Sequence, residues 1–346
     1  MMISTRSTIA GTDAVADAAR AIAHEAYLGP DGDAVEPVIS RSTTWRHLRS
    51  LDLRPNQRVL MVGTGSGYAA ALIAHIVGPG GRILTIDHDH ARTRRAGDLF
   101  AAHDHRATAA TGNPLSGHPG GGPYDRIFVP GTPAEIPAAW VDQLARGGVL
   151  VTGAVVSDLP GAHAVAHITK TPEDGLVATV HADRYPLIEP PVVPAHVVAV
   201  TAADESRYWL ASAAVDDQTV TDYLRIARAG TPEAWPAGPR EFLDFMHWLL
   251  ARRPRGLLTA VTEHGEGIGI GGRAPSAFGL ATRSDGPPEV AMVTPTHVVA
   301  DPPLSLTRAR LLDLIADWRA EGARATHELD AVVLHDGDSY RVRLDD

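Results

Sequence analysis

The residues of clearest chemical use are the glycine-rich segment Gly63–Gly67 (GTGSG) and the acidic residue Asp87. The glycines follow the short apolar run Val59–Val62, and Asp87 ends a second apolar run, Arg82–Ile86, twenty residues after the last glycine. Glycine lets the backbone approach a ligand closely, and the helix expected next offers unpaired N–H groups and a positive dipole end. A carboxylate at the tip of the second strand accepts hydrogen bonds from ribose hydroxyls. Together these features predict a nucleotide-type site in a unit of strand, glycine turn, helix and strand.

The spacing of the glycines narrows the ligand. The dinucleotide fingerprint is GxGxxG, whereas this chain has GxGxG, which favours S-adenosylmethionine as the cofactor. His88 follows Asp87 directly and is placed to line an adenosine pocket. In the alternative interpretation, Asp87 is a solvated acidic residue at a strand end and holds no ligand.

Composition limits the classes of function. The chain has 346 residues and a formal net charge of −10, which disfavours a large nucleic-acid-binding surface. It has no cysteine, which excludes disulfides, cysteine-ligated zinc and a thiol nucleophile. No apolar run is long enough to span a bilayer, and Met1–Ala10 lacks the order of a signal peptide, so we expect a cytoplasmic protein with no membrane partner. The oligomeric state stays open.

Alternating helix and strand patterns surround the glycine segment. Helical patterns occur at Asp13–Tyr27, Ile39–Leu53, Ala91–Ala102 and Ala134–Leu144. Strand patterns occur at Thr108–Ala110, Tyr124–Val129, Val149–Val156 and Ala164–Thr169, with a long loop at Thr111–Pro123. This alternation predicts an α/β fold with a doubly wound, mostly parallel sheet covered on both faces.

The patterns change after a proline-rich stretch at residues 185–196 (YPLIEPPVVPAH). Helical patterns include Phe242–Leu249 and a segment that Ser305 can cap and Gly322 can end. Strand-like pieces lie at Leu257–Val261, Ala277–Ala281, Val290–Val293 and Ala331–Val333, which predicts an α+β domain. Its tryptophans are either core residues or an aromatic peptide-binding surface: Trp209, Trp235, Trp248 and Trp318.

Three blocks of the chain resemble the protein-L-isoaspartate O-methyltransferase family. Ile39-Ser40-Arg41-Ser42 resembles the Ile-Ser-x-Pro block ahead of that family's first sheet strand. Val59–Tyr68 (VLMVGTGSGY) resembles its cofactor block. Tyr124–Ile127, Ile136–Pro137 and Gln143–Gly148 match its later block of strand, helix and paired glycines in order and spacing.

The resemblance implies a class I S-adenosylmethionine-dependent methyltransferase fold and methyl transfer to a peptide carboxylate. By motif position, the cofactor block contributes Gly63, Thr64, Gly65, Ser66, Gly67 and Tyr68, with its glycines facing the methionine end of the cofactor. Asp87 would hold the ribose, and Asn113 stands where the family usually has an acidic residue near the adenine. An asparagine can still accept and donate a hydrogen bond there.

On the substrate side, Ser40 stands at the family's hydroxyl position and is predicted to orient the attacking carboxylate, with Ile39, Ser42 and Thr43 beside it. In the alternative interpretation, the hydroxyl residues of this segment cap the helix before Trp45. A carboxylate is already ionised at neutral pH, so the expected chemistry needs no general base.

The chain departs from the family pattern at several places. Met61 replaces the family's usual Glu, Ser42 replaces its Pro, and the C-terminal third has no counterpart in the minimal repair enzyme. With these departures, the chain resembles the branch of the family that modifies ribosomally made peptides. The resemblance implies that an Asp side chain is methylated and that the ester closes to an aspartimide, which can open to isoaspartate. The implied partner is a modified precursor peptide.

We therefore predict four parts of the chain: a substrate-side helical segment at 1–54, a methyltransferase domain at 55–184, a connector at 185–196 and a peptide-binding α+β domain at 197–346. Two other functions stay open. One is a repair-type isoaspartate methyltransferase acting on damaged proteins, and the other is a non-catalytic cofactor-binding module, which Met61 motivates.

Two further motifs are interpreted as structural. The pairs His88-Asp89-His90 and His103-Asp104-His105 invite a metal hypothesis, but spacing of i, i+2 does not put both rings on one helix face, so no metal is expected. The glycine-rich stretch Gly265–Gly272 is interpreted as a loop or a glycine-containing strand because no helix or phosphate-binding signature follows it.

Overall fold

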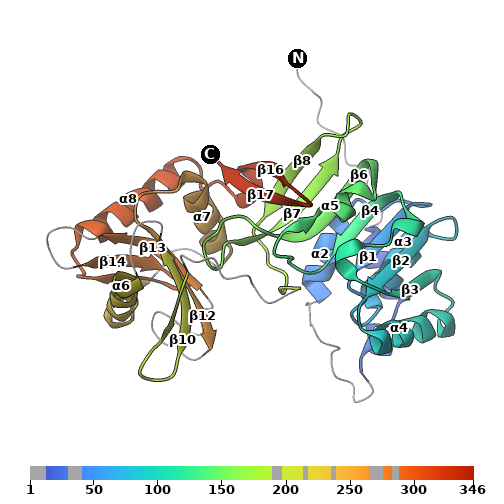
Figure 1. The fold of residues 1–346 in the computed structure, drawn as a ribbon, viewed down its shortest axis with the longest axis horizontal. Coiled ribbons are helices and arrows are strands. Elements are labelled where there is room, and N and C mark those ends of the chain that lie inside the picture. Colours follow the sequence, from blue (N-terminus) through green and yellow to red (C-terminus); the bar gives the residue numbers. More distant parts are fainter. Residues whose placement is uncertain are drawn as a thin grey trace.

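The computed structural model describes residues 13–29, 41–188, 197–212, 217–234, 239–264, 276–282 and 288–346. The described chain forms two seven-stranded sheets and one three-stranded sheet (Figure 1). The predictions for Ile39, Ser40, Trp235 and Gly265–Gly272 lie outside the described residues.

The first sheet has the strand order β3-β2-β1-β4-β6-β7-β8. The first five strands in that order are parallel, and β7 runs antiparallel to both of its neighbours. The strands are β1 (Arg58–Val62), β2 (Arg82–Asp87), β3 (Ala107–Thr111), β4 (Tyr124–Val129), β6 (Leu144–Val155), β7 (His163–Lys170) and β8 (Leu176–His181). The predicted doubly wound, mostly parallel sheet is confirmed.

Both faces of the first sheet are buried, which explains the continuous apolar runs of its strands. In β1, Val59 and Met61 face one core cluster, whereas Leu60 and Val62 face another. Four helices cover the face on which Val59 and Met61 lie: α1 (Ala14–Ala21), α2 (Arg41–Ser50), α3 (Tyr68–Val77) and α4 (His90–Ala102). On the other face lie α5 (Ala138–Asp142) and segments from the C-terminal part of the chain.

The predicted helix Asp13–Tyr27 is wrong in its extent. Asp13 caps the helix by accepting a hydrogen bond from the Ala16 amide, but α1 ends at Ala21 because Ile22 is extended. A 3-10 turn, His24–Tyr27, follows. It turns the rings of His24 and Tyr27 onto Tyr68, a tertiary contact that the local pattern does not contain.

The predicted helix Ala134–Leu144 is also wrong in its extent. Ile136–Pro137 forms the short strand β5, so α5 begins only at Ala138. Strand β6 begins at Leu144, five residues before the predicted Val149, because it pairs with β4 from Tyr124 onward. Both changes arise from strand pairing with distant segments, which overrides the helical preference of the sequence. The expected loop at Thr111–Pro123 contains two 3-10 turns, Pro114–Ser116 and Pro119–Gly121.

The second seven-stranded sheet is antiparallel, with the order β11-β15-β14-β13-β12-β10-β9. Its strands are β9 (Val198–Thr201), β10 (Arg207–Ser212), β11 (Thr231–Ala234), β12 (Leu257–His264), β13 (Ser276–Thr282), β14 (Glu289–Val293) and β15 (His297–Asp301). Helix α6 (Asp217–Ala229) packs on one face, and α8 (Leu306–Ala320) lies on the other with α7 (Pro239–Arg252) (Figure 1). The predicted C-terminal α+β domain is confirmed.

Ser305 caps α8 by accepting a hydrogen bond from the Arg308 amide, as predicted, and Gly322 follows the helix end with a φ of +88°. Trp248 and Trp318 are buried core residues, whereas Trp209 is half-buried. The prediction that the C-terminal tryptophans are core residues is therefore confirmed for Trp248 and Trp318.

The end of the chain pairs with the short strand β5 and forms a separate three-stranded sheet. The hairpin of β16 (Asp330–Asp336) and β17 (Ser339–Asp345) pairs with β5, and it lies between the two large sheets (Figure 1). One continuous core cluster extends from Leu60 and Ile127 of the first sheet to Trp248 and Trp318 of the C-terminal part. The two sheets are thus joined by shared apolar packing as well as by the connector. Within the described residues, no helix is long and apolar enough to cross a membrane.

Candidate active site

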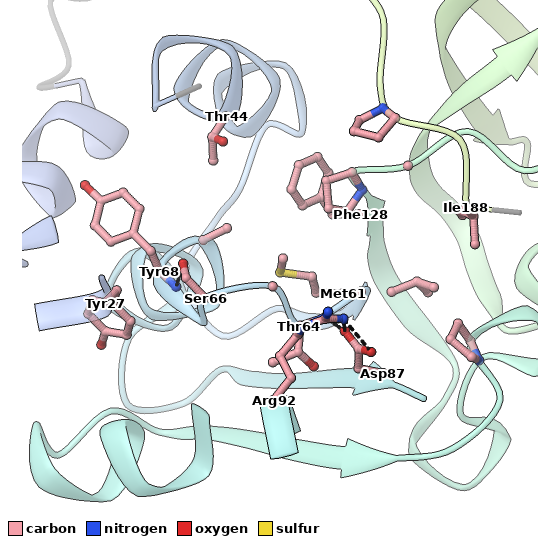
Figure 2. A pocket seen from close by; sticks show the side chains of 18 of the residues that line it. Tyr27, Thr44, Met61, Thr64, Ser66, Tyr68, Asp87, Arg92, Phe128 and Ile188 are labelled. Atoms are coloured by element: carbon pink, nitrogen blue, oxygen red, sulfur yellow. Dashed lines mark hydrogen bonds and ion pairs between the residues drawn. The ribbon is translucent and has the colours of Figure 1, made fainter. Parts of the chain in front are cut away.

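A cavity of about 320 Å³ lies at the carboxyl ends of β1, β2 and β4 (Figure 2). The strand order reverses between β1 and β4, which is the position where open α/β sheets bind ligands. The lining residues come from seven parts of the chain: His24, Tyr27 and Leu28; Arg41 and Thr44; Met61–Ser66 with Tyr68 and Ala69; Asp87, His88 and Arg92; Pro114; Phe128, Pro130 and Gly131; and Pro186–Ile188.

The glycine loop forms the floor of this cavity. Gly63 and Gly65 have φ values of +92° and +52°, which side-chain-bearing residues rarely adopt, and a Cβ added to either would meet nothing within 4 Å. Gly67 also has a positive φ, but its added Cβ would meet the Phe100 ring at 3.3 Å, so it serves the packing of α4 against the loop. The predicted loop residues line the cavity except Gly67, which caps α3.

Asp87 is almost fully buried at the tip of β2 and accepts hydrogen bonds from several donors (Figure 2). Its Oδ2 accepts from the Thr64 amide at 2.9 Å, and its Oδ1 accepts from the Asp89 amide at 3.0 Å. Nη1 of Arg92 donates to both oxygens, at 3.0 and 3.1 Å. The interpretation of Asp87 as a solvated strand-end acid is therefore wrong. Its neighbour His88 lines the cavity and is largely exposed.

One wall of the cavity is aromatic. The His24 ring meets the Tyr68 ring edge-on, with centroids 4.8 Å apart, and Tyr27 lies 5.7 Å from Tyr68. Burial raises the pKa of Tyr27 to about 12 and raises the pKa of Tyr68, and burial followed by the charge of Arg41 lowers the pKa of His24. This wall is therefore uncharged at neutral pH.

Helix α2 forms another wall with Arg41 and Thr44. In Figure 2, Thr44 and Phe128 lie on one side of Met61, whereas Asp87 and Arg92 lie on the other. Ser42 and Thr43 lie on the same helix as Thr44 but are not among the lining residues. The substrate-side roles of Ile39, Ser40, Ser42 and Thr43 stay predictions.

The first residues of the proline-rich connector form the wall of the cavity beside the segment that follows β4. We call Tyr185–Ile188 the strap segment. The Thr132 amide donates to the Pro186 carbonyl at 2.7 Å, and the Ile188 amide donates to the Thr132 carbonyl at 2.9 Å. A Cβ on Gly131 would lie 2.6 Å from Ile188, so this close approach requires glycine. Pro186, Leu187 and Ile188 all line the cavity, so these connector residues are part of the site.

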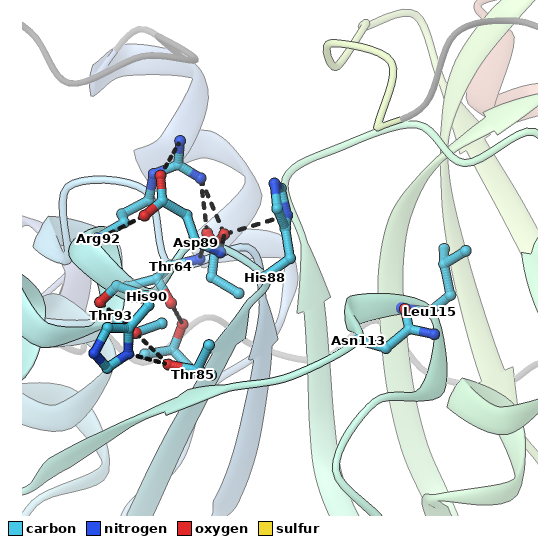
Figure 3. A network of polar contacts seen from close by, with 11 residues as sticks. Thr64, Thr85, His88, Asp89, His90, Arg92, Thr93, Asn113 and Leu115 are labelled. Atoms are coloured by element: carbon cyan, nitrogen blue, oxygen red, sulfur yellow. Dashed lines mark hydrogen bonds and ion pairs between the residues drawn. The ribbon is translucent and has the colours of Figure 1, made fainter.

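Asn113 lies apart from the Asp87 network (Figure 3) and is not a lining residue of the cavity. Its side chain accepts a hydrogen bond from the Leu115 amide and caps a 3-10 turn, while the next residue, Pro114, lines the cavity. Of the histidine pairs, His103 and His105 stack near Tyr27. Among the described residues, no group of three or more side chains has an arrangement that could hold a metal ion.

Arg92, the His24–Leu28 turn and the strap segment are parts of the site that were not predicted from the sequence. Arg92 lies five residues after Asp87, in the first turn of α4, and a basic residue so close to the strand-end acid is a signal that could have been used. The turn and the strap segment lie far from the glycine loop in sequence, and no local motif marks them.

Residues 34–180 match the sequence profile of the family described as Protein-L-isoaspartate(D-aspartate) O-methyltransferase. This segment is therefore similar to that family. The match includes the glycine loop, Asp87 and α2, but ends before the strap segment and the second sheet. The fold of this segment is that of the class I S-adenosylmethionine-dependent methyltransferases.

Relatives of the same family cover only part of this chain. A protein-L-isoaspartate O-methyltransferase of Ignicoccus hospitalis is 38% identical over 127 residues, which are 36% of this chain and 59% of the relative. One from Azorhizobium caulinodans is 40% identical over 103 residues, which are 30% of this chain and 46% of the relative. The chain thus spans about half the length of the curated relatives it matches. A solved structure of a protein-L-isoaspartate O-methyltransferase covers 96% of this chain and 94% of its own, with 17% identity and a TM-score of 0.49.

Proposed function

We propose that the protein is an S-adenosylmethionine-dependent carboxyl O-methyltransferase that methylates an Asp side chain of a ribosomally made peptide. The observation that carries the proposal is the cavity itself, in which a glycine loop and a buried carboxylate face a wall from α2. The family match over residues 34–180 supports the same activity.

The residues of the cavity fit the cofactor. Gly63 and Gly65 leave open space where a side chain would stand, so a ligand can lie against the loop backbone. Asp87 offers the carboxylate for a ribose, and the rings of Tyr68, Tyr27 and His24 are uncharged, so their faces can attract a sulfonium cation. When bound, S-adenosylmethionine supplies an electrophilic methyl group.

The acceptor carboxylate would enter from the α2 side, where Arg41 and Thr44 line the cavity. The Arg41 guanidinium attracts the carboxylate, and the hydroxyl groups of Thr44 and of the predicted Ser40 are donors that can fix which oxygen attacks. That oxygen bonds to the methyl carbon while the carbon–sulfur bond breaks, which gives the methyl ester and S-adenosylhomocysteine.

Orientation and exclusion of water account for the rate, because neither reactant needs a general base. Alignment of this kind can supply about 7–11 kcal/mol of the barrier. Apolar side chains from three elements surround the reaction site, namely Met61, Phe128 and the strap residue Ile188. Met61 leaves the floor uncharged, which avoids repulsion between an acidic side chain and the incoming carboxylate.

The α+β part of the chain supports a dedicated peptide rather than any damaged protein as the substrate. Its core is continuous with that of the first sheet, so a peptide bound across both would be held in a fixed position relative to the cavity. After methylation, the backbone amide nitrogen that follows the modified Asp attacks the ester, methanol leaves and an aspartimide forms. Opening of the ring by water gives Asp or isoaspartate.

The test is incubation of the enzyme and S-adenosylmethionine with the precursor peptide encoded beside the enzyme's gene, followed by mass spectrometry. We expect a gain of one methyl group and then a loss of methanol. A Ser40→Ala variant should lose methylation but keep its affinity for S-adenosylhomocysteine. The matched control is Ser50→Ala, which should stay active because Ser50 lies at the end of α2 and does not line the cavity. An unmodified peptide with the intact enzyme would contradict the proposal.

A second candidate, repair of isoaspartyl damage in many proteins, is favoured by the names of the matched relatives. A short, unstructured isoaspartyl peptide distinguishes the two functions, because a repair enzyme methylates it without a dedicated partner. Cofactor binding with no turnover on either peptide would instead favour a non-catalytic module.

A further inference from the structure

The carboxylate expected to hold the ribose is already saturated. A carboxylate offers about four lone-pair sites. In Asp87, the amides of Thr64 and Asp89 take one site on each oxygen, and Nη1 of Arg92 spans the other two. Nδ1 of the largely exposed His88 lies farther away, 3.5 Å from Oδ1. The two amides lie in the protein backbone and are fixed. Arg92 is therefore the donor that a ribose can replace.

Arg92 has a second acidic neighbour within reach. Its Nη2 lies 3.7 Å from Oδ2 of Asp89, whose other oxygen accepts from the Arg92 amide at 3.0 Å and caps α4. The side chain of Asp89 is 40% exposed and that of Arg92 is 22% exposed, whereas that of Asp87 is 3% exposed. The guanidinium can thus leave Asp87 toward solvent and still keep a carboxylate partner.

We propose that Arg92 competes with the ribose for Asp87: a ribonucleoside reaches this carboxylate only when both of its ribose hydroxyls replace the Arg92 guanidinium. The displaced guanidinium then pairs with Asp89. A ligand without the two hydroxyls cannot satisfy both oxygens and leaves Arg92 in place. This inference rests on the proposed function, since it concerns how that cofactor is bound.

The exchange has a thermodynamic consequence for the free protein. Binding of the diol must first break a charge-assisted contact, so Arg92 lowers the affinity for any ribonucleoside ligand. Ligands without the diol leave Arg92 in place, so Arg92 does not change their affinity. The net effect is weaker binding that is confined to ligands with a ribose diol.

The test measures binding of S-adenosylhomocysteine by calorimetry, which does not depend on turnover. Arg92→Ala and Arg92→Gln should bind it about three- to tenfold more tightly than the unmodified protein, because no ion pair has to be broken. Arg94→Ala is the matched control, since Arg94 is exposed on the same helix and contacts His90, and it should bind with unchanged affinity. 2′,3′-Dideoxyadenosine, which lacks both hydroxyls, should gain no affinity from Arg92→Ala relative to Arg94→Ala.

A double-mutant cycle tests whether the displaced Arg92 guanidinium pairs with Asp89. Asp89→Asn keeps the helix cap but removes the receiving charge, so it should weaken binding about two- to threefold in the presence of Arg92 and not in its absence. Tighter binding by the Arg92 variants together with this coupling supports the inference. Equal or weaker binding by both Arg92 variants overturns it. If neither the unmodified protein nor any variant binds S-adenosylhomocysteine, the proposed function fails and the inference fails with it.

Discussion

The two seven-stranded sheets of this protein have the same number of strands but differ in what they can bind. In the first sheet, five neighbouring strands are parallel, so their carboxyl ends share one edge, and loops and helix N-termini gather there. The second sheet is antiparallel, so strand ends of both kinds alternate along each edge. The cavity with the buried carboxylate lies at the parallel edge. Strand direction, rather than sheet size, therefore decides where the ligand site forms.

The two sheets meet at a junction rich in histidine. His163 and His167 lie on β7 and His181 lies on β8, while His247 on α7 and His327 come from the C-terminal part. His247 is fully buried and contacts Thr326 and the backbone carbonyl of His163. Burial lowers the pKa of His163 and of His247 to about 4 and that of His167 to about 3, so the junction combines apolar packing with these three uncharged rings.

The largest expected effect tests whether the two sheets fold as one unit. Trp248 is fully buried in the shared core, and its Nε1 donates to Glu321 at 3.0 Å. Trp248→Ala should cost about 3–5 kcal/mol of unfolding free energy and lower the melting temperature of a single transition. Calorimetry measures this, with Trp209→Ala on the half-buried position of β10 as the milder control. Two separate transitions would show that the sheets are independent.

The second prediction concerns acid stability of the junction. Burial lowers the pKa of His247 from 6.5 to about 4, so between these values the unfolded chain binds a proton that the folded chain does not. The stability that the neutral His247 ring contributes to the folded protein is fully present above the unfolded pKa of 6.5. It is lost as the pH falls toward 4, by up to about 1.4 kcal/mol per pH unit. Urea denaturation across this range should give a steeper pH dependence for the unmodified protein than for His247→Gln. The exposed His75, changed to Gln, is the control and should leave the slope unaltered.

The third prediction concerns the ligand edge of the first sheet. Asp87→Asn removes the charge that accepts the ribose hydroxyls, and a hydrogen bond to a charged group contributes about 1.5–3 kcal/mol, so S-adenosylhomocysteine should bind roughly 10- to 100-fold more weakly. Calorimetry provides the measurement. Asp125→Asn is the control, because Asp125 is the second residue of β4 and accepts a hydrogen bond from the Arg58 amide away from the cavity. If Asp87→Asn and Asp125→Asn lost equal affinity for S-adenosylhomocysteine, the cause would be a general loss of stability.

The smallest expected effect concerns the strap segment. A Cβ on Gly131 meets Ile188 at 2.6 Å, so Gly131→Ala should displace the strap and weaken S-adenosylhomocysteine binding about threefold. Gly97→Ala on α4 is the control, since its added Cβ meets nothing within 4 Å. Unchanged binding by Gly131→Ala would mean that the strap does not contribute to the cofactor end of the cavity.

Much of the first sheet could be predicted because its signals are local. The apolar runs, the glycine loop and Asp87 follow one another within thirty residues, Arg58–Asp87, and all belong to one strand–helix–strand unit. The errors occurred where distant segments decide the structure. Residues 134–144 read as a helix, yet Ile136–Pro137 pairs with β17, two hundred residues away in the chain. Helical periodicity cannot encode such a partner.

By itself, the sequence determined the α/β class, the position of the glycine loop and the acidic residue at the second strand end, since backbone conformation and hydrophobic periodicity are properties of neighbouring residues. Only the tertiary structure decided that Arg92 pairs with Asp87, that the strap segment lines the cavity and that the C-terminal hairpin pairs with β5. These three features depend on contacts between side chains and strands that fold together from separate parts of the chain.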